Sequence, residues 1–370
     1  MIFYLSSLYI IELGCLLLVI LILLALILIQ RQSDKIKLPN QFPFVTILLA
    51  VRNEENDILN CLTYLSQLDY PKEKIEVLIG DDDSIDNTSS ICERFCIENS
   101  HFKYTHITTQ LDTAIAKANV LAHLAKKAKG EYFLITDADI KVPKNWVKTM
   151  LSLSNHYKTD MVCGVTTVTQ SSFSNSLQAI DWIYAQAMLK CVSSLKIPIT
   201  GIGNNMLISK EAYFSTGGYE NLPPTVTEDF SIYQAIKKNG YSCHTSFENH
   251  SLLHTKGKKD FKSVITQRRR WMQGALKLNK LLVIVLFLQT TYYPAILLFS
   301  FINFHLSISL FCIKAALQAY FIARNMKRIQ VNVPVKALLL FELYSLSLSI
   351  TLLFSYFFTK KIKWKGRTFL

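Results

Sequence analysis

The sequence predicts an α/β protein in which a doubly wound, mostly parallel sheet is joined to transmembrane α-helices at both ends. Three observations support this fold class. Strand, acidic loop and helix alternate three times before residue 140, the pattern of parallel sheets covered by helices. The chain is 50% hydrophobic with a mean hydropathy of +0.24, too apolar for an ordinary soluble protein of this size. Long apolar runs lie near both ends.

The first segment, residues 1–39, is expected to form a transmembrane helix and a linker. An apolar run from Leu16 to Ile29 extends back through Ile10, about 20 residues and enough to span a bilayer. The run lacks the basic start and small-residue cleavage site of a signal peptide. Basic residues follow it, which places the next domain in the cytoplasm; they are Arg31, Lys35 and Lys37.

Residues 40–254 are expected to form that domain, with acidic residues at the ends of its strands. A strand over 44–51 is followed by Glu54, and a strand over 75–80 by Asp81 and Asp82. Carboxyl ends of parallel strands meet at one edge, where open α/β sheets bind their ligands. Acidic residues therefore converge at this edge although the chain has a net charge of +13.

The third strand, residues 133–139, is expected to end in two carboxylates. Strand alternation directs Asp137 and Asp139 to the same face. Hard oxygen ligands at such an edge suit Mg2+ or Mn2+, and hence a diphosphate. The alternative is a strand that turns at a solvated Asp-x-Asp sequence.

Five further segments are expected before residue 220. On the expected helix 111–127, Lys117 could reach a phosphate or be a solvated lysine. A strand is expected over 160–166. The apolar stripe over 175–192 fits a core-packed helix or a helix on the membrane surface. Residues 201–209 are expected to form a glycine turn that leads into a strand, and residues 217–219 a tight turn.

Two polar groups come before the C-terminal apolar runs. A helix expected over 229–238 starts beside Glu228 and Asp229, where a carboxylate could cap the helix or act as a general base. The stretch from Gln267 to Trp271, with three arginines, belongs to an expected interfacial segment at 255–280. Arginine and tryptophan there suit either a membrane boundary or the recognition of a diphosphate.

Residues 281–370 are expected to contain further membrane segments and a basic tail. The run 281–323 is long enough for two helices joined near 303–307, and 337–358 is another apolar span. Three such spans would place the basic tail at 360–367 outside, whereas the positive-inside rule places it inside. About four membrane segments are expected in total, and one apolar segment could be an interfacial or re-entrant helix. The sequence therefore leaves both sides of the membrane as alternatives for the tail.

The net charge limits the classes of binding partner that are expected, and the cysteines indicate the redox compartment. A pI near 9.2 suits lipid head groups, phosphorylated substrates or nucleic acid. No nucleic-acid partner is expected, because the sequence contains no zinc finger, RNA-recognition signature or basic-aromatic repeat. The eight scattered cysteines are expected to be packed thiols in a reducing compartment.

Five motifs in order resemble the membrane-bound family 2 glycosyltransferases, the group that includes ceramide glucosyltransferases, hyaluronan synthases and cellulose synthases. The resemblance covers about residues 42–280. The motifs are Arg52-Asn53-Glu54, Asp81-Asp82 with Ser84 and Asp86, Asp137-x-Asp139, Thr227-Glu228-Asp229 and Gln267-x-x-Arg270-Trp271. The resemblance implies a GT-A type catalytic domain, a UDP-sugar donor and a single displacement with inversion at the anomeric carbon.

The resemblance also implies residue roles. Asp229 is the general base, and Asp139, with Asp137, binds Mg2+ or Mn2+. The remaining residues are expected to bind the donor or acceptor: Glu54, Asp81, Asp82, Lys117, Asp137, Gly203, Asn204, Asn205, Glu228, Gln267, Arg270 and Trp271. Two positions depart from the family pattern, because Ala116 and Asp83 stand where relatives often have glycine.

The resemblance leaves three functions open. The leading expectation is transfer to a lipid or glycolipid acceptor by an integral protein of a bacterial inner (plasma) membrane. A processive polysaccharide synthase is the second, because the motif from Gln267 to Trp271 is typical of those enzymes. A non-catalytic membrane scaffold that keeps the fold is the third.

Overall fold

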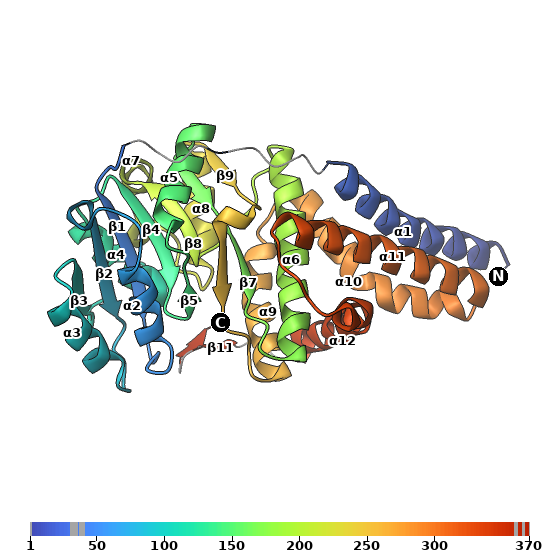
Figure 1. The fold of residues 1–370 in the computed structure, drawn as a ribbon. Helices are drawn as coiled ribbons and strands as arrows, with labels where there is room; N and C mark the ends of the chain where they lie inside the picture. The colour runs from blue at the N-terminus through green and yellow to red at the C-terminus, as the bar shows by residue number, and fades with distance from the viewer. Residues whose placement is uncertain (1, 30–35, 37–40, 359–361, 365–366, 370) are drawn as a thin grey trace.

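The computed structural model describes residues 2–29, 36, 41–358, 362–364 and 367–369. A sheet domain lies at one end of the molecule and a bundle of long helices at the other, with helix α6 between them (Figure 1). The expected basic residues Arg31, Lys35 and Lys37, and Lys360, Lys361 and Lys365 of the tail, lie outside the described residues.

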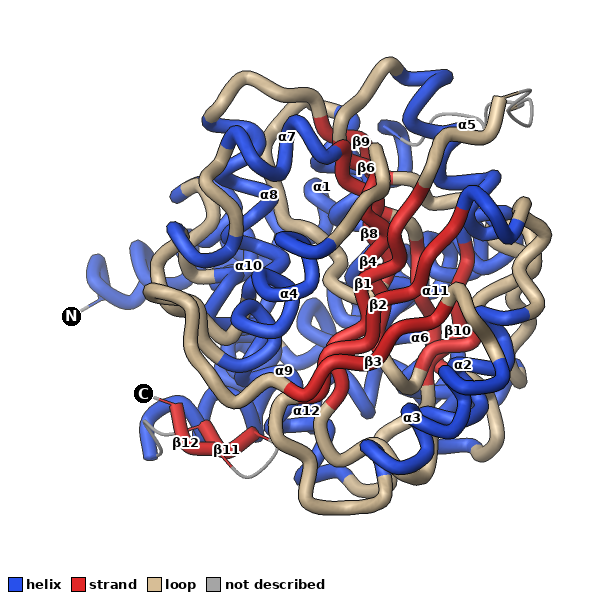
Figure 2. Tube along the Cα trace, turned by 90° about the vertical axis from the view of Figure 1, so that its left-hand side faces the viewer, coloured by secondary structure: helices blue, strands red, loops and turns tan. Residues whose placement is uncertain are grey.

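A seven-stranded sheet forms the centre of the sheet domain, in the order β3-β2-β1-β4-β8-β6-β9. Only β8 runs antiparallel to its neighbours, so the expected mostly parallel sheet is confirmed. Figure 2 shows its strands side by side and twisted. The strands are β1 Val45–Val51, β2 Ile75–Asp81, β3 Phe102–His106, β4 Tyr132–Asp137, β6 Met161–Cys163, β8 Asn205–Ser209 and β9 Cys243–Thr245.

Helices cover both faces of this sheet, because the side chains of its central strands alternate between two apolar cores. In β1, Ile47 and Leu49 face one core and Leu48 faces the other. The first core includes side chains of α2 Ile58–Ser66, α3 Thr88–Glu98 and α5 Trp146–Tyr157. The second includes those of α4 Ala116–Lys127, α7 Lys210–Ser215 and α8 Glu228–Lys238. The doubly wound fold is therefore confirmed.

The structure corrects three local expectations. The strand expected over 160–166 is interrupted at Gly164, so that β6 belongs to the large sheet and β7 Val165–Val168 to a smaller one. The small sheet has the order β5-β10-β7, with β5 Ile140–Lys141 and β10 Leu252–Thr255. Strand β4 ends at Asp137, so Asp139 lies in the turn that follows. The helix expected from residue 111 begins at Ala116.

Among the described residues, four helices are long and apolar enough to cross a membrane, which indicates an integral membrane protein. One is N-terminal and three are C-terminal: α1 Ile2–Ile29, α10 Lys280–Ser300, α11 Phe304–Arg328 and α12 Val335–Phe358. Helices α1, α10 and α11 share a buried apolar cluster that includes Val19, Tyr292 and Leu310. The chain then ends in the hairpin β11 Ile362–Trp364 and β12 Arg367–Phe369.

Helices α6 Phe173–Ser194 and α9 Phe261–Ala275 connect the two halves. One face of α6 packs against α11 and α12, with Ile180, Ile183 and Ala187 buried beside Phe321 and Phe341. Of the two interpretations of this segment, the structure therefore shows a helix that is packed into the protein. A side chain of its N-cap residue, Ser172, accepts a hydrogen bond from the backbone N–H of Asn175.

Candidate active site

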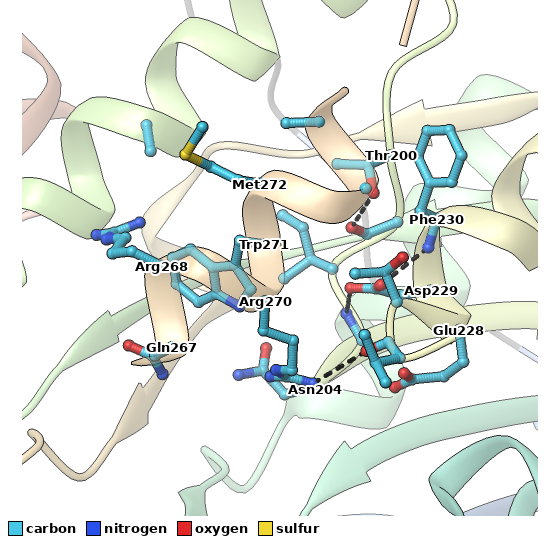
Figure 3. A pocket seen from close by; sticks show the side chains of 18 of the residues that line it. Thr200, Asn204, Glu228, Asp229, Phe230, Gln267, Arg268, Arg270, Trp271 and Met272 are labelled. Atoms are coloured by element: carbon cyan, nitrogen blue, oxygen red, sulfur yellow. Dashed lines mark hydrogen bonds between the residues drawn. The ribbon is translucent and has the colours of Figure 1, made fainter. Parts of the chain in front are cut away.

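A cavity of about 580 Å³ lies between the carboxyl edge of the large sheet and helices α6, α9 and α10. It brings together residues that are far apart in the sequence, and Figure 3 shows one part of its wall, with Asn204, Asp229 and Trp271 among the labelled side chains. Twelve of the expected site residues line it: Glu54, Asp82, Lys117, Asp137, Asp139, Gly203, Asn204, Glu228, Asp229, Gln267, Arg270 and Trp271. Asp81 and Asn205 do not.

Lys117 lies at the centre of the charged part of this cavity. Its Nζ is 2.5 Å from Asp137 Oδ1 and 3.2 Å from Glu228 Oε1, and it donates a 2.9 Å hydrogen bond to the Gly203 carbonyl. Burial alone would lower the pKa of Lys117, but Asp137 and Glu228 outweigh it and raise that pKa. Lys117 is thus an ion-paired group in the cavity wall, and not the solvated helix lysine of the alternative interpretation.

Asp229 lies in the first turn of α8, with its carboxylate fixed from two sides. Its Oδ2 accepts a 3.0 Å hydrogen bond from the backbone N–H of Gly203, and its Oδ1 accepts one of 2.8 Å from Phe230. Burial, followed by repulsion from Glu228, raises the pKa of Asp229 to about 6, although Lys117 and Arg270 act in the opposite direction. A carboxylate with this pKa is suited to accept a proton near neutral pH.

Asp137 and Asp139 contribute two carboxylates to the cavity wall. Asp139 Oδ2 accepts a 3.1 Å hydrogen bond from Thr255 Oγ1. The buried thiol of Cys61 reports the local negative charge, since burial and then Asp139 and Asp137 raise its pKa. Within the described ranges, no group of three or more His, Cys, Asp or Glu side chains gathers at a metal site.

This donor set fits a divalent cation that shares its ligands with a substrate. Mg2+ is commonly held by one or two carboxylates together with phosphate oxygens and water, without an all-protein cage. Asp137 and Asp139 supply hard oxygen donors of that kind at the edge of the cavity. A third protein carboxylate is not required for such a site.

Asp81 and Asn205 have their polar atoms occupied by the protein. Asp81 is fully buried at the end of β2 and accepts hydrogen bonds from Ser84, Ser89 and Tyr104. It thereby holds the loop that carries Asp82. Asn205 is also fully buried and uses its amide to join β8 to neighbouring segments, with partners Trp146, Val165 and Ser251.

Helix α9 presents the Gln267–Trp271 motif to the cavity. Asp260 caps the helix by accepting a 2.8 Å hydrogen bond from the backbone N–H of Ser263. Trp271 packs edge-on against Trp182 of α6, with ring centroids 4.9 Å apart. The guanidinium of Arg268 lies 4.3 Å from the Trp271 ring centroid and forms an ion pair with Asp181 of α6.

Two arginines in the cavity wall were not among the expected site residues. Arg52 follows β1 directly, donates to the backbone carbonyl of Asp82 and lies 3.9 Å from its carboxylate. Its position directly after a strand could have identified it as a site residue from the sequence. Arg268 lines the cavity beside Arg270, but its partner Asp181 is 87 residues away in sequence, so its position depends on tertiary packing.

The cavity continues from these charged groups into an apolar part at the membrane helices. Its wall there is formed by α1, α6, α10 and α12, with no Asp, Glu, Lys or Arg among the lining residues of these four helices. These residues include Ile22, Leu26, Met188, Leu189, Val192, Leu282, Val285, Leu286, Gln289 and Leu352. A single cavity therefore connects the ionisable groups with apolar side chains of the long helices.

Comparison with known proteins identifies the family. The model of glycosyl transferase family 21 matches residues 13–370. The chain belongs to glycosyl transferase family 21. This confirms the glycosyltransferase-family resemblance inferred from the motifs.

Two curated relatives of this family 21 protein differ in their products. The chain is 26% identical over 232 residues to the poly-beta-1,6-N-acetyl-D-glucosamine synthase of Staphylococcus epidermidis, covering 62% of this chain and 54% of the relative. It is 24% identical over 246 residues to the beta-monoglucosyldiacylglycerol synthase of Nostoc sp., covering 64% and 50%. The chain thus spans about half the length of these relatives.

A solved structure confirms the fold of the family 21 protein. A mannosyltransferase from Pyrobaculum calidifontis, solved with GDP-Man and Mn2+, superimposes with a TM-score of 0.61. The match covers 95% of this chain and 98% of the mannosyltransferase, at 18% sequence identity. The expected GT-A type fold is therefore present, with its sheet and its helices in the same overall arrangement.

Proposed function

We propose that this glycosyltransferase transfers a hexose from a UDP-sugar to a hydroxyl of a lipid or glycolipid acceptor, with inversion at the anomeric carbon. The observation that carries the proposal is the continuity of one cavity from Asp229 to the apolar side chains of α1, α6 and α10. A nucleotide sugar suits the charged part and the alkyl chains of a lipid suit the apolar part. The name of the Nostoc relative, a diacylglycerol glycoside synthase, supports this acceptor class.

In the proposed reaction, Asp229 acts as the general base. Its carboxylate accepts the proton of the acceptor hydroxyl while the hydroxyl oxygen attacks the anomeric carbon. The bond between that carbon and the diphosphate oxygen breaks, and UDP leaves with the bonding electrons. The hydrogen bonds from Gly203 and Phe230 hold the carboxylate in one orientation, which limits the loss of rate from misalignment.

The diphosphate is proposed to lie between α9 and the acidic edge. Gln267 and Arg270 contribute from α9, and Lys117 contributes its ammonium group from α4. Arginine donors match phosphate oxygens and stabilise negative charge on a leaving group. Asp137 and Asp139 would hold Mg2+ or Mn2+, and the bound ion would neutralise part of the diphosphate charge. The Mn2+ in the mannosyltransferase structure supports the choice of metal.

The nucleoside is proposed to bind at the ends of β1 and β2. Glu54 and Asp82 line the cavity there, so they are the groups that can contact uracil or ribose. Asp81 is assigned a positioning role instead of direct contact, because its oxygens bind Ser84, Ser89 and Tyr104. The two asparagines are separated in the same way, with Asn204 at the cavity and Asn205 buried behind it.

A processive polysaccharide synthase is the second candidate. The 26% identity to the poly-beta-1,6-N-acetyl-D-glucosamine synthase favours it, as does the motif from Gln267 to Trp271. Cellular location is part of the same proposal: an integral protein of a bacterial inner membrane with its catalytic domain in the cytoplasm. The four apolar helices support the membrane part of this statement.

The test is nucleotide release by detergent-purified protein, with a panel of UDP-sugars and GDP-mannose, with and without lipid extract, in Mn2+ or EDTA. The proposal predicts UDP release that requires both metal and lipid and yields a glycolipid. Release without added lipid, together with a ladder of long chains, would favour the synthase. Release of GDP alone would overturn the donor assignment. Release from no donor in any lipid would favour the non-catalytic scaffold.

A further inference from the structure

The catalytic half of the protein comprises the sheet domain with helices α6 and α9. Helix α12 stays beside this half along most of its length. Near its start, Ala337 and Phe341 are buried in one cluster with Ile183 of α6. Further on, Leu348 is buried against Val264 of α9. The contacts of α12 therefore pass from one connecting helix to the other.

Near the C-terminal end of α12, Leu352 is also in contact with the catalytic half. Leu352 lines the cavity together with Arg268 and Trp271 of α9. From Ala337 to Leu352 a helix advances by roughly 22 Å at 1.5 Å per residue. A helix that crossed the membrane would carry Leu352 most of that distance away from α9. Leu352 instead lies at the same cavity as Arg268 and Trp271.

The arrangement in space agrees with these contacts. In Figure 1, α1, α10 and α11 extend lengthwise away from the sheet domain, whereas α12 is seen close to end-on beneath them. Strand β11, which follows α12, is drawn beside the sheet domain and not at the far end of the bundle. Helix α11 ends at the catalytic half as well, since Arg328 forms an ion pair with Glu248. Both ends of α12 thus lie near the sheet domain and not at the far end of the helix bundle.

We propose that α12 does not cross the membrane but lies within the leaflet on the side of the catalytic domain, with lipid chains as the partner of its exposed face. That face is apolar and continuous with the surface of the membrane helices. It comprises Val335, Leu339, Leu343, Ile350 and Phe354, each at least 40% exposed. The opposite face packs against α6, α9 and α10. Only α1, α10 and α11 then span the bilayer.

The polar side chains of α12 fit this position. Lys336, in its first turn, lies 5.9 Å from the Phe173 ring at the start of α6. The carboxylate of Glu342 points into the bundle, where it pairs with Lys314 of α11 at 2.6 Å and accepts hydrogen bonds from Tyr293 and Gln318. An ionised group in a leaflet is tolerated when it is paired inside the protein. The lipid face carries none.

This position of α12 also removes the conflict between the number of membrane spans and the positive-inside rule. With three spans, the hairpin β11–β12 lies on the same side as the catalytic domain. Lys363 and Arg367 of this hairpin then lie on the same side as Arg324, Lys327 and Arg328 at the end of α11. Such a cluster near the surface is attracted to anionic lipids, and the positive-inside rule is satisfied throughout.

The first test determines on which side of the membrane the tail lies. An epitope tag is inserted after Gly240, after Ile302 or at the C-terminus of the full chain, and intact and lysed spheroplasts are treated with protease. We expect the tags at Gly240 and at the C-terminus to be protected alike, and the tag at Ile302 to be cleaved from outside. A C-terminal tag that behaves like the tag at Ile302 would overturn the proposal. Three tags on one side would also overturn it, because no spanning hairpin would remain.

The second test measures depth. Spin labels are attached at Leu339 or Ile350 through an unnatural amino acid, which leaves the eight cysteines intact, and the protein is placed in nanodiscs with anionic lipid. A helix in the leaflet gives both labels similar depths, whereas a spanning helix separates them by roughly 16 Å. Labels shielded from both oxygen and a water-soluble relaxant would indicate a protein partner and would overturn the lipid assignment. Neither test depends on the proposed enzymatic activity.

Discussion

The backbone N–H of Gly203 donates a 3.0 Å hydrogen bond to Oδ2 of Asp229, 26 residues later in the sequence. A Cβ atom at position 203 would lie 3.1 Å from this oxygen and 3.1 Å from the Asp229 Cβ. The glycine therefore allows the loop before β8 to approach the first turn of α8. This contact joins the turn expected on the acceptor side to the expected general base.

Gly203→Ala is predicted to lower kcat about tenfold, because the added methyl group must displace the Asp229 carboxylate by a few tenths of an ångström and misplace the base. Steady-state kinetics with saturating donor measure this. Gly14→Ala is the matched control, since no atom lies within 4 Å of its added Cβ. An unchanged kcat in Gly203→Ala would show that the orientation of Asp229 does not limit the reaction.

Asp229→Asn is predicted to reduce kcat by roughly 10²- to 10⁴-fold, the range expected for loss of a general base. Donor affinity should change little, because the amide keeps the size of the side chain. Nucleotide titration and single-turnover transfer separate the two effects. Asp112→Asn is the control, since Asp112 is exposed and outside the cavity. Full transfer activity in Asp229→Asn would remove Asp229 from the mechanism.

The pH profile should carry the signature of Asp229. A base with a pKa of about 6 is ionised above that pH, so kcat/KM should fall about tenfold per unit below it. Lys117 lowers the pKa of Asp229. Lys117→Gln is therefore predicted to move the acid limb to higher pH, whatever its effect on the plateau.

The control for this shift is Lys126→Gln. Lys126 is on the same helix but pairs with Glu220, 3.3 Å away, so the limb should stay in place. An acid limb that is the same in all three proteins would mean that another group controls the profile.

Ala116→Gly is predicted to stabilise the protein by about 0.5–1 kcal/mol. Ala116 has φ of +50°, a left-handed conformation that costs a residue with a Cβ about 1–2 kcal/mol, partly offset by the greater entropy of unfolded glycine. Asp83, with φ of +58°, should gain less in Asp83→Gly, because aspartate tolerates this region better. Thermal unfolding in detergent measures both. A destabilised Ala116→Gly would contradict the backbone argument.

Val285→Trp is predicted to raise the KM for a lipid acceptor at least tenfold and to leave donor binding unchanged. Val285 lines the apolar part of the cavity, and the larger side chain would fill space that alkyl chains need. Ile284→Trp is the control on the same helix, because Ile284 is 55% exposed and does not line the cavity. Equal kinetics in the two variants would argue against acceptor binding in this part of the cavity.

Local sequence patterns predicted the elements well where burial is simple. The run before Arg52 is apolar except for Thr46 and forms β1 between two helix layers, because both faces of a central parallel strand are buried. The pattern failed at Gly164, where the backbone passes from one sheet to another. A Cβ at Gly164 would clash with the Asn205 side chain, 2.3 Å away, and no periodicity within the segment contains that information.

The same limit applies to the candidate site. Asp81 and Asp82 are adjacent and chemically equal in the sequence, yet only Asp82 lines the cavity, because Ser89 and Tyr104 take the oxygens of Asp81. Departures from the family pattern were visible at Ala116 and Asp83, but their shared left-handed backbone was not. The role of each lining residue in catalysis stays a prediction until the variants are measured.

Local sequence patterns were enough to predict the alternation of strands and helices, the acidic strand ends and the apolar runs, because propensity and periodicity act over a few neighbouring residues. Tertiary structure alone decided which carboxylates share Lys117, which asparagine reaches the cavity and how α12 lies. Each of these depends on contacts between segments that are far apart in the chain, such as Lys117 with Glu228 and Leu348 with Val264. Long-range packing sets the pKa of Asp229 for the same reason: burial and the charges of its neighbours exist only in the folded protein.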